Sequence, residues 1–181
     1  MLTTCTTPFR DKNHFFVTED HNNLPSVSII HNQLKGNSLS TRVREKIEAL
    51  LETPTIDFLK EKNVPLGIIT NGPTDHQTKK LKQLQLNNWI PSRNMLISQA
   101  TGFQKPEKEI FQLAEKEFHM LPEETLYVGD NYDNDVLGAK SANWQALWFN
   151  HRERKIEQTP ICDIEISSFD QLFSPMKTIF V

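Results

Sequence analysis

From residue 54 onward, segments of helical periodicity alternate with short aliphatic runs. This alternation constrains the fold more than any other feature, because it is typical of α/β domains with a largely parallel sheet. The apolar run at 66–69 is too short for a helix and lies between Pro65 and Pro73, so we expect a buried strand that ends at Thr70. We therefore predict an α/β fold, a Rossmann-like parallel sheet with helices on both faces.

The remaining elements are predicted by the same criteria. Further strands are expected at 95–97, 126–128 and 145–149, with a last short strand and a closing helix beginning in the segment 161–173. Helices are expected at 54–63, 74–85, after Pro106 and at 136–142. The first forty residues are polar and irregular, with two short β-prone runs at 14–18 and 27–31, and an amphipathic helix is expected after Thr41.

Composition excludes several classes of protein. The chain has 181 residues and a net charge of −3, which gives no basic surface for nucleic acid. Its two cysteines, Cys5 and Cys162, lack disulfide-framework or zinc-site spacing, and this favours a reducing compartment. The first residues printed have no apolar stretch typical of a signal peptide, and about 18 consecutive apolar residues occur nowhere in the sequence. We therefore expect a cytoplasmic protein whose partners are small molecules rather than nucleic acid or membrane.

Three groups of polar residues follow the predicted strands. Thr70, Asn71 and Gly72 offer a hydroxyl and accessible backbone N–H groups that suit phosphate oxygens. Lys105 precedes a helix N-terminus, where an ammonium is unfavourable unless an anionic group lies nearby. Taken singly, these features are also compatible with a capping turn and a solvated lysine.

The third group is an acidic cluster. Asp130 and Asp135, with Asp133 between them, crowd the end of a strand and the start of the next helix. Carboxylates placed this way suit Mg²⁺, although acids here could also act only as helix caps. Ligands of open α/β sheets bind at the carboxyl ends of the strands, so the joint occurrence of hydroxyl, lysine and carboxylates favours a magnesium and phosphate site.

These segments resemble the motifs of haloacid dehalogenase-like hydrolases. GIITNG is similar to the second motif, GFQKPEKEIF to the third, and YVGDNYDNDVLGAK to the fourth, and the following SANWQALWFNHRE resembles the phosphatase and nucleotidase branch. The resemblance implies that Thr70 and Asn71 bind the transferring phosphoryl group and that Lys105 offsets its negative charge. It also implies that Asp130 holds Mg²⁺, that Asp135 supports that site, and that the substrate is a small phosphorylated metabolite.

The chain departs from this family in one respect. The first motif, DxDxT, which carries the nucleophilic aspartate, does not occur in the sequence. One alternative places HFFVTEDHNNL at this position, with Thr18 replacing the nucleophile and Asp20 the general acid and base. We favour the other account, in which residues 1–52 are an irregular or helical remnant of the family's cap region, residues 53–181 are the core, and the chain starts late.

A missing first-motif strand has structural consequences. It would leave central strands without a neighbour, and unpaired buried backbone groups cost about 1–3 kcal/mol each. We therefore expect that strand exchange could form a homodimer, and that this chain alone has little phosphatase activity.

Two classes of function remain open. The first is a phosphoric-monoester hydrolase, and the alternative is a noncatalytic phosphate- or metal-binding relative that serves as an interaction module. A phosphoacceptor signalling domain is disfavoured, because its acidic pair would precede the threonine and lysine in the chain. Neither GxxxxGK[ST] nor GxGxxG occurs, which excludes the common nucleotide-binding loops.

Overall fold

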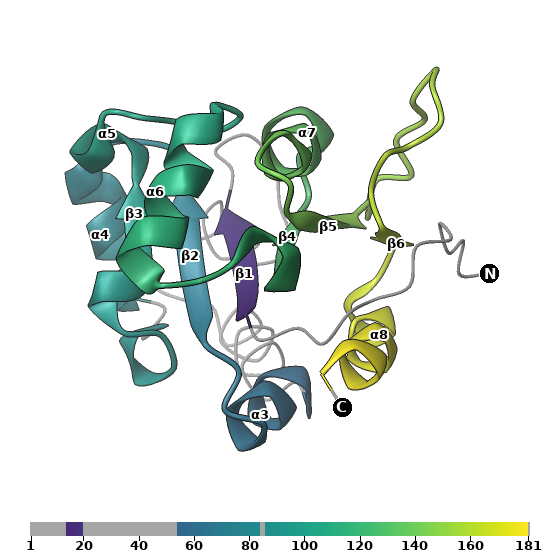
Figure 1. Ribbon diagram of the computed structural model, residues 1–181, viewed down its shortest axis with the longest axis horizontal. Helices are drawn as coiled ribbons and strands as arrows, with labels where there is room; N and C mark the ends of the chain where they lie inside the picture. Colours follow the sequence, from purple (N-terminus) through teal and green to yellow (C-terminus); the bar gives the residue numbers. More distant parts are fainter. Residues whose placement is uncertain (1–13, 20–53, 84–85, 181) are drawn as a thin grey trace.

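The computed structural model describes residues 14–19, 54–83 and 86–180. It contains a six-stranded parallel sheet in the order β3-β2-β1-β4-β5-β6, with helices on both faces (Figure 1). The strands are β1 (His14–Glu19), β2 (Leu66–Thr70), β3 (Met95–Ile97), β4 (Thr125–Gly129), β5 (Gln145–Phe149) and β6 (Ile164–Ile166). The predicted α/β class with a parallel sheet is confirmed.

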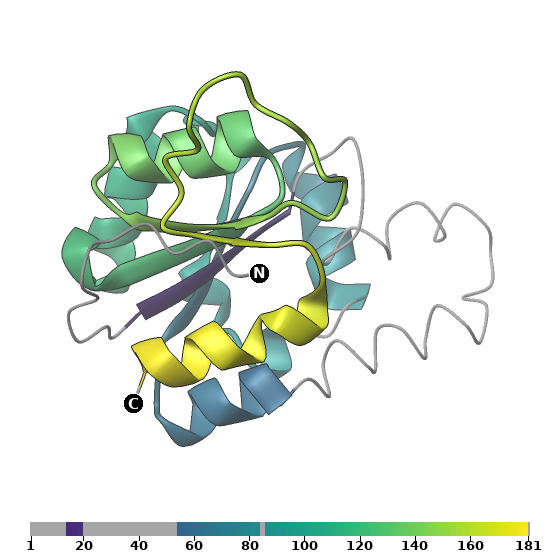
Figure 2. The same cartoon turned by 90° about the vertical axis from the view of Figure 1, so that its right-hand side faces the viewer.

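The longer helices form two layers. They are α3 (Pro54–Glu61), α4 (Thr74–Gln83), α6 (Lys108–Phe118), α7 (Leu137–Ser141) and α8 (Phe173–Ile179). Short turns fill the connections: α5 (Ser98–Thr101), a π-helix (Tyr132–Val136), and 3₁₀ turns at Leu86–Asn88, Ser92–Asn94, Pro122–Glu124 and Phe169–Gln171. Figure 2 shows the sheet between the α6 and α7 layer and the α3 and α8 layer.

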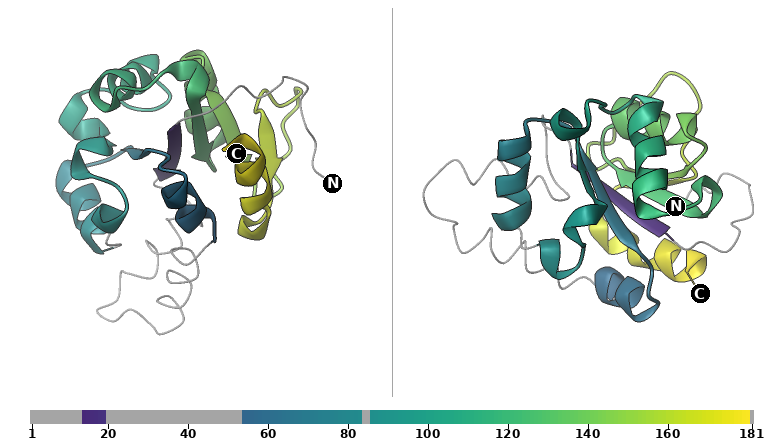
Figure 3. Two further views of the ribbon diagram at one scale, coloured as in Figure 1. Left: turned by 60° about the horizontal axis from the view of Figure 1, so that its bottom comes forward. Right: turned by 60° about the vertical axis from the view of Figure 1, so that its left-hand side comes forward.

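Side-chain alternation along the strands explains the two layers. In β4, Leu126 and Val128 join a core with residues of α3, α4 and α8, whereas Tyr127 joins the core beneath α6 and α7. Successive residues of a strand point to opposite faces, so a strand covered on both sides reads as a continuous apolar run. On the first face, α3 and α8 lie side by side (Figure 3), and the rings of Phe58 and Phe173 meet edge to face at 5.9 Å.

The strand β1 corrects our account of the N-terminal segment. It lies at the centre of the sheet, paired with β2 from Phe15↔Leu66 to Glu19↔Thr70 and with β4 from His14↔Thr125 to Val17↔Val128. The expected gap between β2 and β4 is therefore filled by the same chain, because the short run His14–Glu19 supplies the backbone partners that both strands require. This removes the open edge on which the predicted strand exchange depended.

The division at residues 52 and 53 consequently does not separate the sheet from the rest, since six residues of the first part form a central strand. The β-prone run at 27–31, the amphipathic helix after Thr41 and Asp20 lie outside the described residues. None of the described helices is long and apolar enough to cross a membrane.

Candidate active site at the carboxyl edge of the sheet

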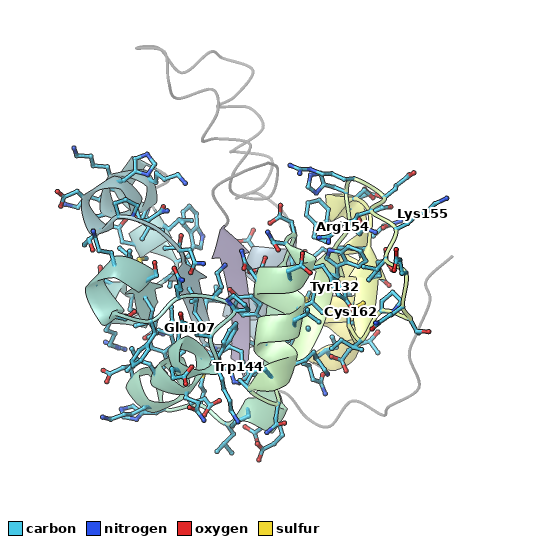
Figure 4. All side chains as sticks on the ribbon, turned by 90° about the horizontal axis from the view of Figure 1, so that it is seen from above. Glu107, Tyr132, Trp144, Arg154, Lys155 and Cys162 are labelled. Atoms are coloured by element: carbon cyan, nitrogen blue, oxygen red, sulfur yellow. The ribbon has the colours of Figure 1, made fainter. Side chains whose placement is uncertain are left out.

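The predicted site residues lie at or after the carboxyl ends of three strands, with Thr70 to Gly72 at the end of β2, Lys105 in the loop between α5 and α6 that follows β3, and Asp130 and Asp135 after β4. Thr70 is the last residue of β2, is fully buried, and is the register partner of Glu19 in β1 and of Ile97 in β3. Figure 4 looks down on the molecule from above, with Glu107 on one side of β1 and Tyr132 and Arg154 on the other. The parallel strands thus bring together residues that are far apart in sequence.

Lys105 and Asp135 form a buried ion pair. The ammonium Nζ of Lys105 donates to Asp135 Oδ1 at 2.7 Å, and both side chains have 0% exposure. The same Nζ lies 5.8 Å from the centroid of the Tyr127 ring. The expectation that an anionic group accompanies Lys105 is confirmed. The alternative of a solvated lysine is wrong, because the side chain is fully buried. A buried ammonium requires a charged partner, which Asp135 provides.

Asn71 holds the backbone of Lys105. Its Nδ2 donates to the Lys105 carbonyl at 2.9 Å, and its Oδ1 accepts from the Lys105 N–H at 2.9 Å. One carboxamide therefore pairs with both polar groups of a residue 34 positions away and connects the end of β2 to the loop before α6. In this arrangement the Asn71 side chain fixes the backbone of Lys105. Binding of phosphate by Asn71 stays a prediction.

Gly72 also has a protein partner. Its backbone takes φ 137°, a conformation that favours glycine, and its N–H donates to Ser98 Oγ at 2.8 Å. Gln99, the residue after Ser98, accepts through its Oε1 from the Thr74 N–H at 2.7 Å. This bond satisfies one of the backbone N–H groups that have no partner within the first turn of α4. These contacts fix the loop after β2, while the predicted binding of phosphate by Gly72 stays a prediction.

Asp135 has partners on both carboxylate oxygens. Besides the ion pair at Oδ1, its Oδ2 accepts from the Asn131 N–H at 2.9 Å. A Cβ at Gly129 would lie 2.5 Å from Asp135 Cγ and Oδ2, so glycine is required for this approach to β4. These contacts orient Lys105 through Asp135, and the implied support of a Mg²⁺ site by Asp135 stays a prediction.

Asp130 follows β4 and is partly exposed, with its backbone carbonyl accepting from the Trp148 indole at 3.1 Å. Within the described ranges, no three His, Cys, Asp or Glu side chains gather at a possible metal position. Mg²⁺ commonly takes only one or two protein carboxylates and completes its shell with water and phosphate. One carboxylate from Asp130 is compatible with such an ion, and its role as a Mg²⁺ ligand stays a prediction. Asp133 pairs instead with the exposed Arg154 at 3.0 Å.

Sequence reasoning missed two contributors, Ser98 and Trp148. Ser98 follows the end of β3, so the strand-edge rule that selected Thr70 would also have found it. Trp148 lies within β5, and no local pattern distinguishes its indole N–H as a partner of Asp130. Both contacts join residues at least 18 positions apart in the chain.

Comparison with known proteins places this arrangement in a family. The sequence profile of haloacid dehalogenase-like hydrolases matches residues 13–149, a range that includes β1 and every predicted site residue. The glyceraldehyde 3-phosphate phosphatase of Pyrococcus furiosus is 32% identical over 139 residues, which are 73% of this chain and 57% of the relative. The phosphoserine phosphatase of Thermus thermophilus is 31% identical over 114 residues, 63% of this chain and 45% of the relative. The chain thus spans about half the length of these relatives.

Solved structures share the fold. The HAD-hydrolase YfnB from Bacillus subtilis, solved bound to magnesium, superposes with a TM-score of 0.67 at 17% identity. The superposition covers 92% of this chain and 99% of the YfnB chain. A HAD phosphatase from Thermococcus onnurineus gives a TM-score of 0.66 at 21% identity, and the superposition covers 93% of this chain and 100% of the phosphatase chain. The profile match over most of the chain shows that it belongs to the haloacid dehalogenase-like hydrolases, and the shared parallel sheet agrees with this.

Proposed function

We propose that this chain binds the phosphoryl group of a small metabolite together with Mg²⁺ at the carboxyl edge of its sheet, as a phosphatase of low turnover. The observation that carries the proposal is the buried Lys105 and Asp135 pair, whose lysine backbone is held by Asn71. A buried, oriented ammonium at the same edge of the sheet as a strand-end hydroxyl and a partly exposed aspartate suits a dianionic ligand with a divalent ion.

Each residue then has a separate role. Thr70 binds a phosphoryl oxygen through its hydroxyl, and Lys105 offsets the negative charge on the phosphoryl group. Asp130 holds Mg²⁺, and Asp135 keeps the Lys105 ammonium in place. When bound, Mg²⁺ would stabilise the charge that develops on the phosphoryl oxygens.

The nucleophile position decides the level of activity. The strand β1 occupies the centre of the sheet, where the family's first motif is expected, and the alignment of HFFVTEDHNNL puts Thr18 at the nucleophile position. Threonine cannot form the family's aspartyl-phosphate, so we expect binding of phosphate with little or no hydrolysis by that route. Asp20, the counterpart of the general acid and base, lies outside the described residues.

The substrate class is inferred from the relatives. Their names specify glyceraldehyde 3-phosphate and phosphoserine as substrates of those proteins. Both are small phosphate monoesters, and we infer the same class here. The threonine at position 18 also favours an alternative, a noncatalytic phosphate- and metal-binding relative that serves as an interaction module.

Restoring the carboxylate distinguishes these functions. Hydrolysis of p-nitrophenyl phosphate with Mg²⁺ would be measured for the wild type, Thr18→Asp, and the matched control Thr18→Asn, which has the same shape without a nucleophilic carboxylate. We expect negligible turnover by the wild type and Thr18→Asn, and a gain for Thr18→Asp that Asp130→Ala abolishes. Normal wild-type turnover that Asp130→Ala abolishes would contradict the proposed low activity, and no gain from Thr18→Asp would favour the noncatalytic alternative.

A further inference from the structure

The peptide unit between Asp130 and Asn131 is held at both of its polar ends. Its carbonyl oxygen accepts from Trp148 Nε1 at 3.1 Å, and its N–H donates to Asp135 Oδ2 at 2.9 Å. Two hydrogen bonds on opposite sides of one planar group fix the rotation of that plane. Because the plane contains the Cα of Asp130, holding the plane also fixes the point from which the Asp130 side chain extends.

The contact with Trp148 lies where the strand ladder ends. In the register of β4 and β5, Gly129 is the partner of Trp148, and Asp130 is the first residue beyond β4. A partly buried carbonyl at such a point favours a protein donor, since unpaired backbone groups are costly to bury. The Trp148 indole, attached to the neighbouring strand, provides that donor.

The indole itself has little freedom to move. Trp148 is 1% exposed, and its ring packs edge to face on Tyr132 with centroids 4.8 Å apart. The Tyr132 hydroxyl in turn accepts from the Ile161 N–H at 3.0 Å. The donor is therefore fixed by the π-helix after β4 and by the chain that leads into β6.

We propose that Trp148 is a positioning residue for the metal-binding carboxylate of Asp130. This inference rests on the proposed function, because it assigns a role within the same site. Residues behind the ligands of a metal set the ligands' orientation, and their loss commonly weakens metal binding. Trp148 contacts neither metal nor substrate in this role and acts through the Asp130 backbone.

The chain provides a matched control in Trp144. It precedes β5, is also 1% exposed, and donates its indole N–H to Glu115 Oε1 at 2.8 Å. Glu115 belongs to α6, and Trp144 lies about 13 Å along the strand direction from Trp148. Phenylalanine at either position keeps an aromatic ring and removes one N–H donor.

The test compares the full chain with Trp148→Phe and Trp144→Phe by isothermal titration with Mg²⁺, alongside thermal unfolding of each protein. We expect Trp148→Phe to raise the dissociation constant of Mg²⁺ roughly 10-fold. Trp144→Phe should leave that dissociation constant unchanged, even if its midpoint of thermal unfolding falls as far as that of Trp148→Phe. Equal Mg²⁺ affinity in the wild type and Trp148→Phe would overturn the inference and leave the proposed function intact.

A wild type that binds no Mg²⁺ would instead contradict the proposed function, and the inference with it. If Trp148→Phe does not fold, the indole N–H resonances of the wild type decide, with Trp148 assigned from spectra of Trp144→Phe and Trp89→Phe. Adding Mg²⁺ should shift the Trp148 resonance and not that of Trp144. An unmoved Trp148 resonance at saturating Mg²⁺ would overturn the inference.

Discussion

The Nζ of Lys105 lies 2.7 Å from Asp135 Oδ1, with both side chains fully buried. Removing one partner of such a pair leaves an uncompensated charge in the interior. We expect Lys105→Met to lower the free energy of unfolding by about 3–5 kcal/mol. Urea denaturation measures this change.

The exposed pair Arg154 and Asp133 is the control for that experiment. Its N–O distance is 3.0 Å, but the side chains are 48% and 59% exposed. Arg154→Met should lower the free energy of unfolding by only about 0–1 kcal/mol, because water screens the pair. Equal losses from the two methionine variants would contradict the role that we give to burial.

Gly129 allows Asp135 to approach β4. In Gly129→Ala the new Cβ would lie 2.5 Å from Asp135 Cγ and Oδ2, so the carboxylate must move. We expect a loss of about 1–3 kcal/mol in the free energy of unfolding, as for other overpacked cores, together with weaker binding of Mg²⁺.

Gly102→Ala separates this clash from a general effect of replacing glycine. Gly102 has φ 79°, and no atom lies within 4 Å of the position that a Cβ would take there. Its alanine variant therefore suffers only the backbone strain of about 1–2 kcal/mol and should keep the Mg²⁺ affinity of the wild type. A Gly129→Ala protein with unchanged Mg²⁺ affinity would show that the position of Asp135 does not matter for the metal.

Two asparagines make the same kind of backbone clamp at different places. Asn71 pairs with both polar backbone groups of Lys105, and Asn150, after β5, accepts from the Arg154 N–H at 2.7 Å and donates to the Arg154 carbonyl at 3.0 Å. Asn71→Ala should destabilise the fold by about 1–3 kcal/mol, because the backbone of the buried Lys105 loses its partners. Asn150→Ala should also destabilise the fold, although the backbone of the exposed Arg154 can bind water instead.

Only Asn71→Ala should also weaken the binding of inorganic phosphate, since only this clamp orients Lys105. Calorimetric titration of both alanine variants with phosphate in the presence of Mg²⁺ measures the difference. If Asn150→Ala weakened phosphate binding as much as Asn71→Ala does, the weaker binding would result from lower stability of the fold and not from a change in the orientation of Lys105.

The alternation of helical and strand periods is sufficient to predict most of the sheet. The bounds predicted for β5, Gln145–Phe149, are those of the structure, and the run before Thr70 predicts β2, because buried parallel strands are continuous apolar runs between turn residues. Sequence reasoning offered β1 as the central strand only in the alternative that we did not favour, since its run Phe15–Val17 is short and polar residues surround it. Its position is set by pairing with β2 and β4, which no local pattern contains.

The same limit applies to the site. Lys105 and Asp135 can each be selected because strand ends and helix starts are visible in the sequence, and their direct contact follows from the fold. The bonds from Asn71 to Lys105 and from Trp148 to Asp130 cross 34 and 18 residues, respectively. Such bonds depend on which strands are neighbours, and sequence periodicity does not specify this.

The central claim is that Asp130, Lys105 and Thr70 form one site for Mg²⁺ and phosphate. The most direct measurement is calorimetric titration of the full chain with inorganic phosphate, with and without Mg²⁺, for the wild type and Asp130→Ala. We predict that phosphate binds the wild type, that Mg²⁺ strengthens this binding, and that Asp130→Ala loses the strengthening while remaining folded. Phosphate binding that is absent from the wild type, or strengthened equally by Mg²⁺ in Asp130→Ala, would contradict the account.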